Sequence, residues 1–303
     1  MRRFLIVLVL VALALPASAR HAWRKYHWSS TSFPMNIKVA DNTSSAWSGY
    51  LTEAIGDWNQ SSKLNLSKVS GGQGSACNPT AGRIEVCNGA YGQNGWLGIA
   101  QIWLTDSRSN HIAQGTAKMN DTYYASAFYN TPGWRDLVMC QEVGHDFGLG
   151  HQDERNGNTN LGSCMDYTSY PDGGGTGGSL SNRAPNAHDY AQLDSIYNHT
   201  DSANSFFSTY GIMTDSLTRS GTQIPALDIE VNQVWQWGTP VAWDDNGRPI
   251  RFERNLGGIS ANHDNGEEHP EGPEGVILVT DVFWAPFDPF VAPERGVGRP
   301  AVK

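Results

Sequence analysis

The apolar and polar residues of this 303-residue chain alternate with a period of two in several segments, which predicts strands. In residues 34–40, Met35, Ile37 and Val39 alternate with more polar neighbours, as in a half-buried strand. Similar patterns predict further strands at residues 64–69, 83–87, 96–104 and 113–119. One strand, a helix, four strands and a long helix is the order expected of an α/β (α+β) fold, in which helices back a twisted mixed sheet of five strands.

Other segments repeat their apolar residues with the 3.6-residue period of a helix. Residues 45–58 have this pattern, with Ser44 or Ser45 available as the N-cap. Residues 186–197 have it too, and Asn186 is their predicted cap, with an acidic residue three positions further on. We therefore expect one helix after the first strand and another near residue 190.

A third and central helix is predicted to start at Thr131, which caps well and is followed by a proline suited to the first turn. On this helix Gln141 and His145 lie one turn apart on the same face. Gly148 ends the helix, because glycine adopts the left-handed conformation without penalty. The chain can then turn His151 back towards Gln141 and His145.

Gln141, His145 and His151 are therefore candidate metal ligands, with Glu142 beside them. Two imidazoles, an oxygen donor and an open fourth position suit a catalytic zinc ion. A neighbouring glutamate can take a proton from the metal-bound water, which is the role we expect for Glu142.

Gln141 is the weakest of these candidates, because an amide oxygen is a poorer zinc donor than imidazole. If Gln141 does not bind, Tyr167 or Asp153 is expected to complete the ligands. Alternatively, the site is dead and its histidines are ordinary interior residues. The remaining histidines have no suitable ligand spacing, and we expect His111 and His188 on the surface.

The stretch that begins at Gln141 reads Gln-Glu-x-x-His-x-x-Gly-x-x-His, and a Ser-Cys-Met-Asp-Tyr segment containing Met165 follows it. This order resembles the metzincin zinc endopeptidases, closest to their matrixin-like branch, in which a histidine stands at the position of Gln141. The resemblance implies that Met165 lies beneath the metal without bonding it. It also implies that Tyr167 either binds zinc or donates to the tetrahedral intermediate.

The resemblance further implies a secreted zinc-dependent endopeptidase that uses Glu142 as general base and acid. Its substrate, a peptide or protein, would pair as an added strand with an exposed edge strand at residues 97–104. One catalytic zinc is expected, a structural calcium ion is left open, and the chain is expected to be a monomer. The alternative is a catalytically degenerate metzincin fold that acts as an extracellular binding module.

Four cysteines in an exported chain suggest two disulfides. Cys77 with Cys87 would close a short loop. If the resemblance holds, Cys140 with Cys164 would tie the metal-site helix to the methionine turn. Metal binding by cysteine is the alternative, but the chain contains no Cys-x-x-Cys pair.

The resemblance covers about residues 33–200 and implies a catalytic domain of residues 20–200, and the pattern changes beyond them. Residues 201–303 contain an Asn-Gly turn at Asn246 between two strand patterns, and a third strand pattern at residues 276–284. We expect a small β-rich appendage of unknown function, with no recognisable chemistry.

Residues 1–19 combine arginines, a short apolar run and small residues before Arg20, which is typical of a secretory signal peptide. We therefore expect a secreted protein without a membrane segment once the signal is removed. The formal net charge is −9 and no basic patch stands out, so nucleic acid is not an expected partner.

Overall fold

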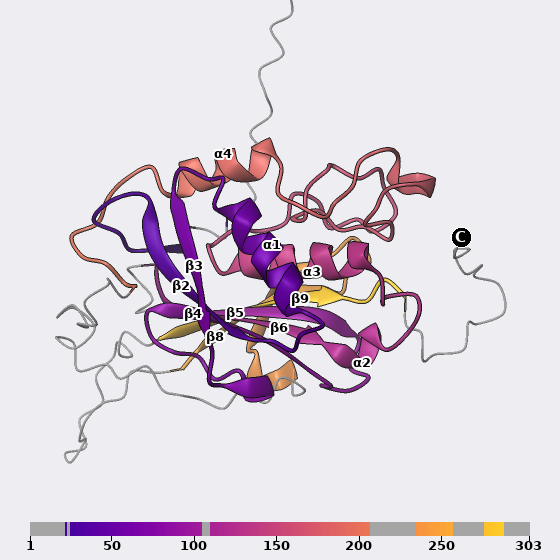
Figure 1. Cartoon of the computed structure of the whole chain (residues 1–303), viewed down its shortest axis with the longest axis horizontal. Helices are drawn as coiled ribbons and strands as arrows, with labels where there is room; N and C mark the ends of the chain where they lie inside the picture. Colours follow the sequence, from indigo (N-terminus) through magenta and orange to yellow (C-terminus); the bar gives the residue numbers. More distant parts are fainter. Residues whose placement is uncertain (1–21, 23–24, 105–109, 207–233, 257–275, 288–303) are drawn as a thin grey trace, which may run out of the picture.

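The computed structural model describes residue 22 and residues 25–104, 110–206, 234–256 and 276–287. The predicted signal peptide lies outside these residues. The described chain is a mixed α/β fold in which α1, α3 and α4 lie on one side of a large sheet (Figure 1). Its helices are α1 (Ser48–Trp58), α2 (Asp121–Tyr124), α3 (Pro132–His145) and α4 (Ala187–Ile196). Its strands are β1 (His27–Trp28), β2 (Met35–Asn42), β3 (Leu64–Ser70), β4 (Arg83–Gly89), β5 (Trp96–Leu104), β6 (His111–Asn120), β7 (Thr239–Trp243), β8 (Pro249–Asn255) and β9 (Ile277–Trp284).

The sheet contains all five expected strands and is larger than predicted. Its order in the described residues is β3-β2-β4-β6-β5-β9-β8-β7, and β1 pairs with β6 beside this path. One half of the sheet is parallel and consists of β1, β2, β3, β4 and β6. From β6 onward the pairing is antiparallel, through β5, β9, β8 and β7.

The C-terminal strands join this sheet through β9, which pairs along the length of β5 with Ala100 opposite Asp281. Nearly every residue of β9 is buried, as expected for a strand covered on both faces. The prediction of an exposed edge at residues 97–104 is therefore wrong, because β9 of the same chain takes up the hydrogen bonds of that edge.

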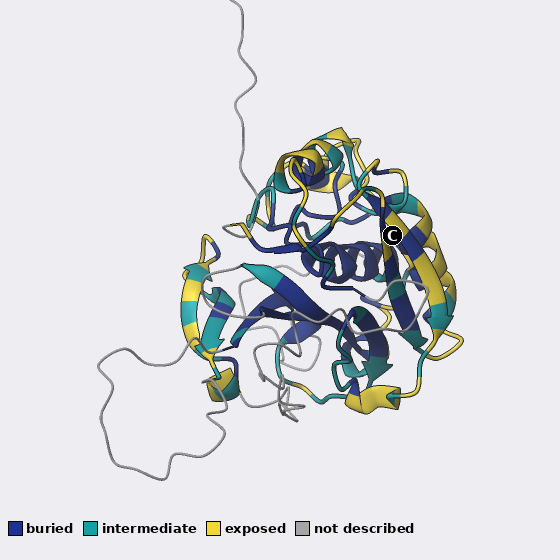
Figure 2. Cartoon of the chain, turned by 90° about the vertical axis from the view of Figure 1, so that its left-hand side faces the viewer, coloured by how far each residue is buried: buried dark blue, intermediate teal, exposed yellow. Residues whose placement is uncertain are grey.

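The helices confirm two of the three predicted caps. The Thr131 hydroxyl accepts the N–H of Trp134, and Asn186 forms a capping box with Asp189. Neither Ser44 nor Ser45 caps α1, because the helix begins later and Trp47 stands at the N-cap. Figure 2 shows the central helix buried all round, in agreement with the burial of α3.

Both predicted disulfides are present, Cys77 with Cys87 and Cys140 with Cys164. The second links α3 to the turn that carries Met165. It therefore fixes the helix of the predicted metal site to the segment beneath it.

Candidate metal centre

Three glycines let other elements approach α3 and its end closely. A Cβ at Gly98 of β5 would lie 2.5 Å from Glu142 Oε1, and one at Gly144 would lie 2.7 Å from Met165 Sδ. Gly148 has φ of +85°, and a Cβ there would collide with the carbonyl oxygen of Tyr26. α3 ends at His145, three residues before the predicted stop at Gly148, and the positive φ of Gly148 turns the chain after the helix. Met165 lies directly against the helix.

The two predicted histidines lie together, and an aspartate from β9 joins them. His145, His151 and Asp281 are buried, and their ligand atoms all lie within 4.8 Å of one another. The two imidazole centroids are 4.7 Å apart. His145 Nδ1 lies 2.8 Å from the carbonyl oxygen of Leu149, so its N–H donates there and Nε2 keeps the lone pair that a metal requires.

Asp281 was not among the predicted ligands. Its oxygens also accept from Arg251 of β8, with Nε to Oδ2 at 2.9 Å. Burial raises the pKa of Asp281 to about 7, against the opposing effect of Arg251. A bound cation would favour the ionised carboxylate. Asp153, the carboxylate considered in the sequence analysis, instead pairs with Arg155 at 3.0 Å.

Gln141 is fully buried, and its amide has one clear partner. Its Nε2 donates to the carbonyl oxygen of Cys164 at 2.7 Å. Its Oε1 has no hydrogen-bond partner among the described residues. An orphaned acceptor on the predicted ligand face fits a nearby cation, because buried polar atoms are normally satisfied.

Glu142 is also fully buried, and neither carboxylate oxygen has a hydrogen-bond partner within the described chain. Burial raises its pKa well above the ordinary value, and the charges of Asp281 and Asp146 raise it further. A raised pKa favours the protonated carboxyl, the form that can give a proton to a leaving amine.

The Tyr167 hydroxyl is hydrogen-bonded to β9. The hydroxyl donates to the carbonyl oxygen of Val282 on β9 at 2.9 Å. The ring lies between His151 and Phe283, with centroids 4.5 Å and 4.8 Å away. The predicted roles of Tyr167 at the metal are therefore not seen here, since β9 takes its hydroxyl.

No protein-family model matches the chain, and no curated protein matches it. Among solved structures, the chain is similar to high choriolytic enzyme 1, a hatching-enzyme zinc protease from the medaka fish Oryzias latipes. The identity is 12% and the TM-score 0.33, over 57% of this chain and 94% of that one. Myroilysin gives 11% identity and a TM-score of 0.34, over 59% of this chain and 85% of that one. Similarity at these scores does not establish a function for this chain.

Proposed function

We propose that the chain is a zinc-dependent endopeptidase whose metal is bound by His145, His151 and Asp281. The observation that carries this proposal is the meeting of these three buried ligands at the end of α3. Two imidazoles and a carboxylate are a common ligand set of catalytic zinc. The orphaned oxygen of Gln141 supplies a further neutral donor on the same helix.

Zinc bound there would polarise a peptide carbonyl and lower the pKa of a water molecule. Glu142 is the residue that we expect to accept the proton of the attacking water. The same carboxyl then passes the proton to the departing amine. Gly98 leaves the Glu142 carboxyl the space that a side chain on β5 would fill.

The described conformation is a closed form of the proposed enzyme. β9 lies along β5, where the resemblance places a bound peptide, and its Asp281 is the third ligand. A catalytic zinc site keeps one position open for water or substrate. We infer that a substrate must displace β9, and Asp281 with it, so that Gln141 and the two histidines remain with the metal.

A binding protein without catalysis is the second candidate, and one observation favours it. β9 occupies the edge of β5 and accepts the Tyr167 hydroxyl, so this conformation leaves no strand edge at β5 for a substrate. The two candidates differ in metal content and in hydrolysis.

Export to an oxidising compartment is also part of the proposal. Both disulfides fit such a compartment, as does the predicted signal at residues 1–19. Among the described residues, no helix has the length and apolar character needed to cross a membrane. A peptide substrate, the monomeric state and calcium binding stay predictions.

Elemental analysis and a cleavage assay test the proposed function together. The purified chain is stripped with a chelator and then reloaded with Zn²⁺. The wild type should then contain zinc at this centre, and the His145→Gln and His151→Gln variants should not. The wild type should cleave an unfolded protein, and the chelator should stop this cleavage. Zinc content unchanged in both variants would reject the site, whereas zinc bound without any cleavage would favour the binding protein.

A further inference from the structure

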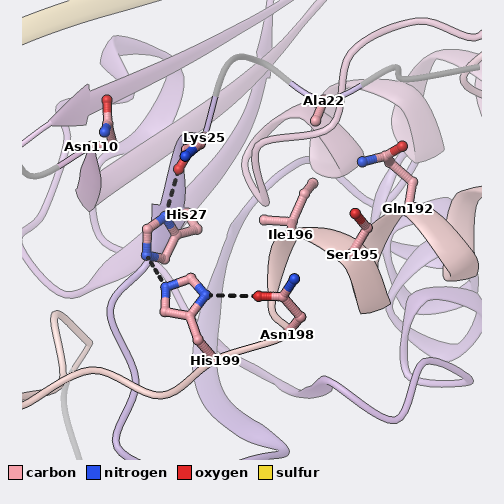
Figure 3. Close-up of a pocket in the computed structure, with 9 residues that line it drawn as sticks. All are labelled: Ala22, Lys25, His27, Asn110, Gln192, Ser195, Ile196, Asn198 and His199. Atoms are coloured by element: carbon pink, nitrogen blue, oxygen red, sulfur yellow. Dashed lines mark hydrogen bonds between the residues drawn. The ribbon is translucent and has the colours of Figure 1, made fainter.

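A second group of metal-binding side chains lies where the N-terminal strand meets the sheet, outside the residues of the first centre. His27 lies on β1, His111 begins β6, and His199 and Asp201 follow α4. Ligand atoms of His27, His111 and Asp201 all lie within 4.8 Å of one another. Figure 3 shows the rings of His199 and His27 facing each other among the residues that line a pocket.

His27, His111 and Asp201 form the compact part of this group, and His199 adjoins it through His27 and Asp201. His111 Nε2 lies 3.3 Å and His199 Nε2 lies 3.6 Å from Asp201 Oδ1. The Nε2 atoms of His27 and His199 are 3.3 Å apart, and His27 Nε2 is 3.8 Å from Oδ2 of the same carboxylate. Ligands at about 2.0–2.1 Å from zinc are separated from one another by about 3.3–3.4 Å in a tetrahedron.

The hydrogen bonds around the group leave lone pairs at its centre. His27 Nδ1 lies 2.5 Å from the carbonyl oxygen of Lys25, and His199 Nδ1 lies 3.2 Å from Asn198 Oδ1. Each Nδ1–H donates to that oxygen, so both Nε2 atoms are acceptors facing each other. A cation between the two rings would satisfy both lone pairs.

Two hydrogen bonds with the backbone of Ser30 orient Asp201 towards the centre of this group. Its Oδ2 accepts the backbone N–H of Ser30 at 2.9 Å, and the Asp201 N–H donates to the Ser30 carbonyl at 2.7 Å. These bonds fix the carboxylate and direct Oδ1 towards His111 and His199. Partners of this kind commonly orient the ligands of metal sites.

We propose that His27, His111 and Asp201 bind a second zinc ion, with the adjoining His199 as the fourth ligand. Three imidazoles and one carboxylate suit zinc, and four protein ligands make a closed, structural site rather than a catalytic one. The adjoining pocket of about 640 Å³, lined in part by Lys25 and Gln192, gives the ion a path from solvent.

The ion would cross-link β1, β6 and the segment after α4. β1 needs such support, because it pairs with β6 over only two residues. The indole of Trp28 donates to the Asp146 carbonyl at 2.8 Å, and Tyr26 contacts Gly148. The second ion would thus brace the loop that carries His151.

Zinc stoichiometry of the full chain tests this proposal. Stripped protein is reloaded with Zn²⁺, freed of excess metal and analysed by elemental analysis. We expect about two zinc ions per wild-type chain and about one in His199→Gln and in Asp201→Asn. His199→Gln alters a side chain that is 47% exposed, and Asp201→Asn keeps the acceptor for Ser30, so both should fold.

His188→Gln is the matched control and should keep both ions. His151→Gln should lose only the first-centre zinc, which separates this proposal from the proposed function. Zinc should raise the melting temperature of His151→Gln by roughly 5 °C or more, and this rise should vanish when Asp201→Asn is added. Wild-type zinc content in both second-site variants would overturn the proposal.

Discussion

Buried carboxyl groups around α3 determine the chemistry at the scale of single residues. Burial raises the pKa of Glu142 and of Asp146 well above their ordinary values, and that of Asp281 to about 7. Gly115 leaves room for Asp146, and a backbone hydrogen bond from Thr116 only partly offsets the rise in the pKa of Asp146. Several buried acids with few donors make the interior receptive to a cation.

Asp166, in the methionine turn, should make stability fall with rising pH. Burial raises its pKa from 3.8 to about 6, although Leu161 N–H and Asn182 donate to it. The folded chain therefore binds this proton more tightly than the unfolded chain. The contribution is complete below about pH 4 and is lost as pH rises through 6, by up to about 3 kcal/mol.

Asp166→Asn has no proton to lose and keeps an acceptor for both donors. Between about pH 4 and pH 7, its unfolding free energy should decline less than that of the wild type by up to about 3 kcal/mol. Urea unfolding at several pH values measures this difference. Parallel pH profiles for the two proteins would show that the wild-type carboxyl titrates normally.

Gln141 should contribute to the affinity for zinc through Oε1. Gln141→Ala removes that oxygen, and the affinity of the first centre should fall by at least about tenfold. Competition with a chromophoric chelator measures it, with exposed Gln60→Ala as the control. Unchanged affinity would mean that Gln141 only links α3 to Cys164.

The residues of the first centre that lie on α3 and in the turn after it could be predicted from the sequence. Helical spacing brings Gln141 and His145 to one face, and the turn at Gly148 returns His151, so local rules suffice. Asp281 is 130 or more residues away and depends on strand pairing that no local rule specifies. The one indication of its role in the sequence is a charged residue within a mostly apolar strand, because charged residues are rarely buried without a partner.

At the scale of the element, the turn that follows α3 depends on Gly148. Gly148→Ala adds a Cβ that meets the Tyr26 carbonyl at a positive φ, and we expect a loss of about 2 kcal/mol or more. Gly56→Ala is the matched control, because a Cβ there meets nothing within 4 Å and alanine favours α1 by up to about 1 kcal/mol. Denaturant unfolding compares them, and equal stability of Gly148→Ala and wild type would contradict the expected strain.

Elements with strong local patterns were predictable, and short ones were not. The caps at Thr131 and Asn186 follow from side chains that reach the nearest N–H groups. α1 begins after both predicted serines, because the Trp47 side chain is buried there and donates to Asp121 at 2.7 Å. β1 and α2 were missed, because two and four residues are too few to show a period.

At the scale of the whole molecule, β9 connects the C-terminal region to the metal centre. The sequence placed residues 201–303 in an appendage, whereas β7, β8 and β9 extend the main sheet beyond β5. Register is what brings Asp281 opposite Ala100 and next to the histidines. Pairing between strands so distant in the chain could not be deduced from pattern alone.

Asp281→Asn should weaken zinc binding and yet speed peptide cleavage. The amide still accepts from Arg251, but it is a poorer ligand, so β9 is held less firmly over the centre. We expect zinc affinity to fall at least about tenfold and cleavage at saturating zinc to rise by a similar factor. Asp153→Asn is the control and should match the wild type. Slower cleavage by Asp281→Asn at saturating zinc would mean that Asp281 belongs to the active form.

The most direct test of the central claim is cleavage of an unfolded protein by Asp281→Asn and by Asp281→Asn with Glu142→Ala, both loaded with zinc. The account predicts equal zinc content and a loss of cleavage by about 10²- to 10⁴-fold in the double variant, because the proton acceptor is gone. Cleavage at an undiminished rate with zinc still bound would contradict the account.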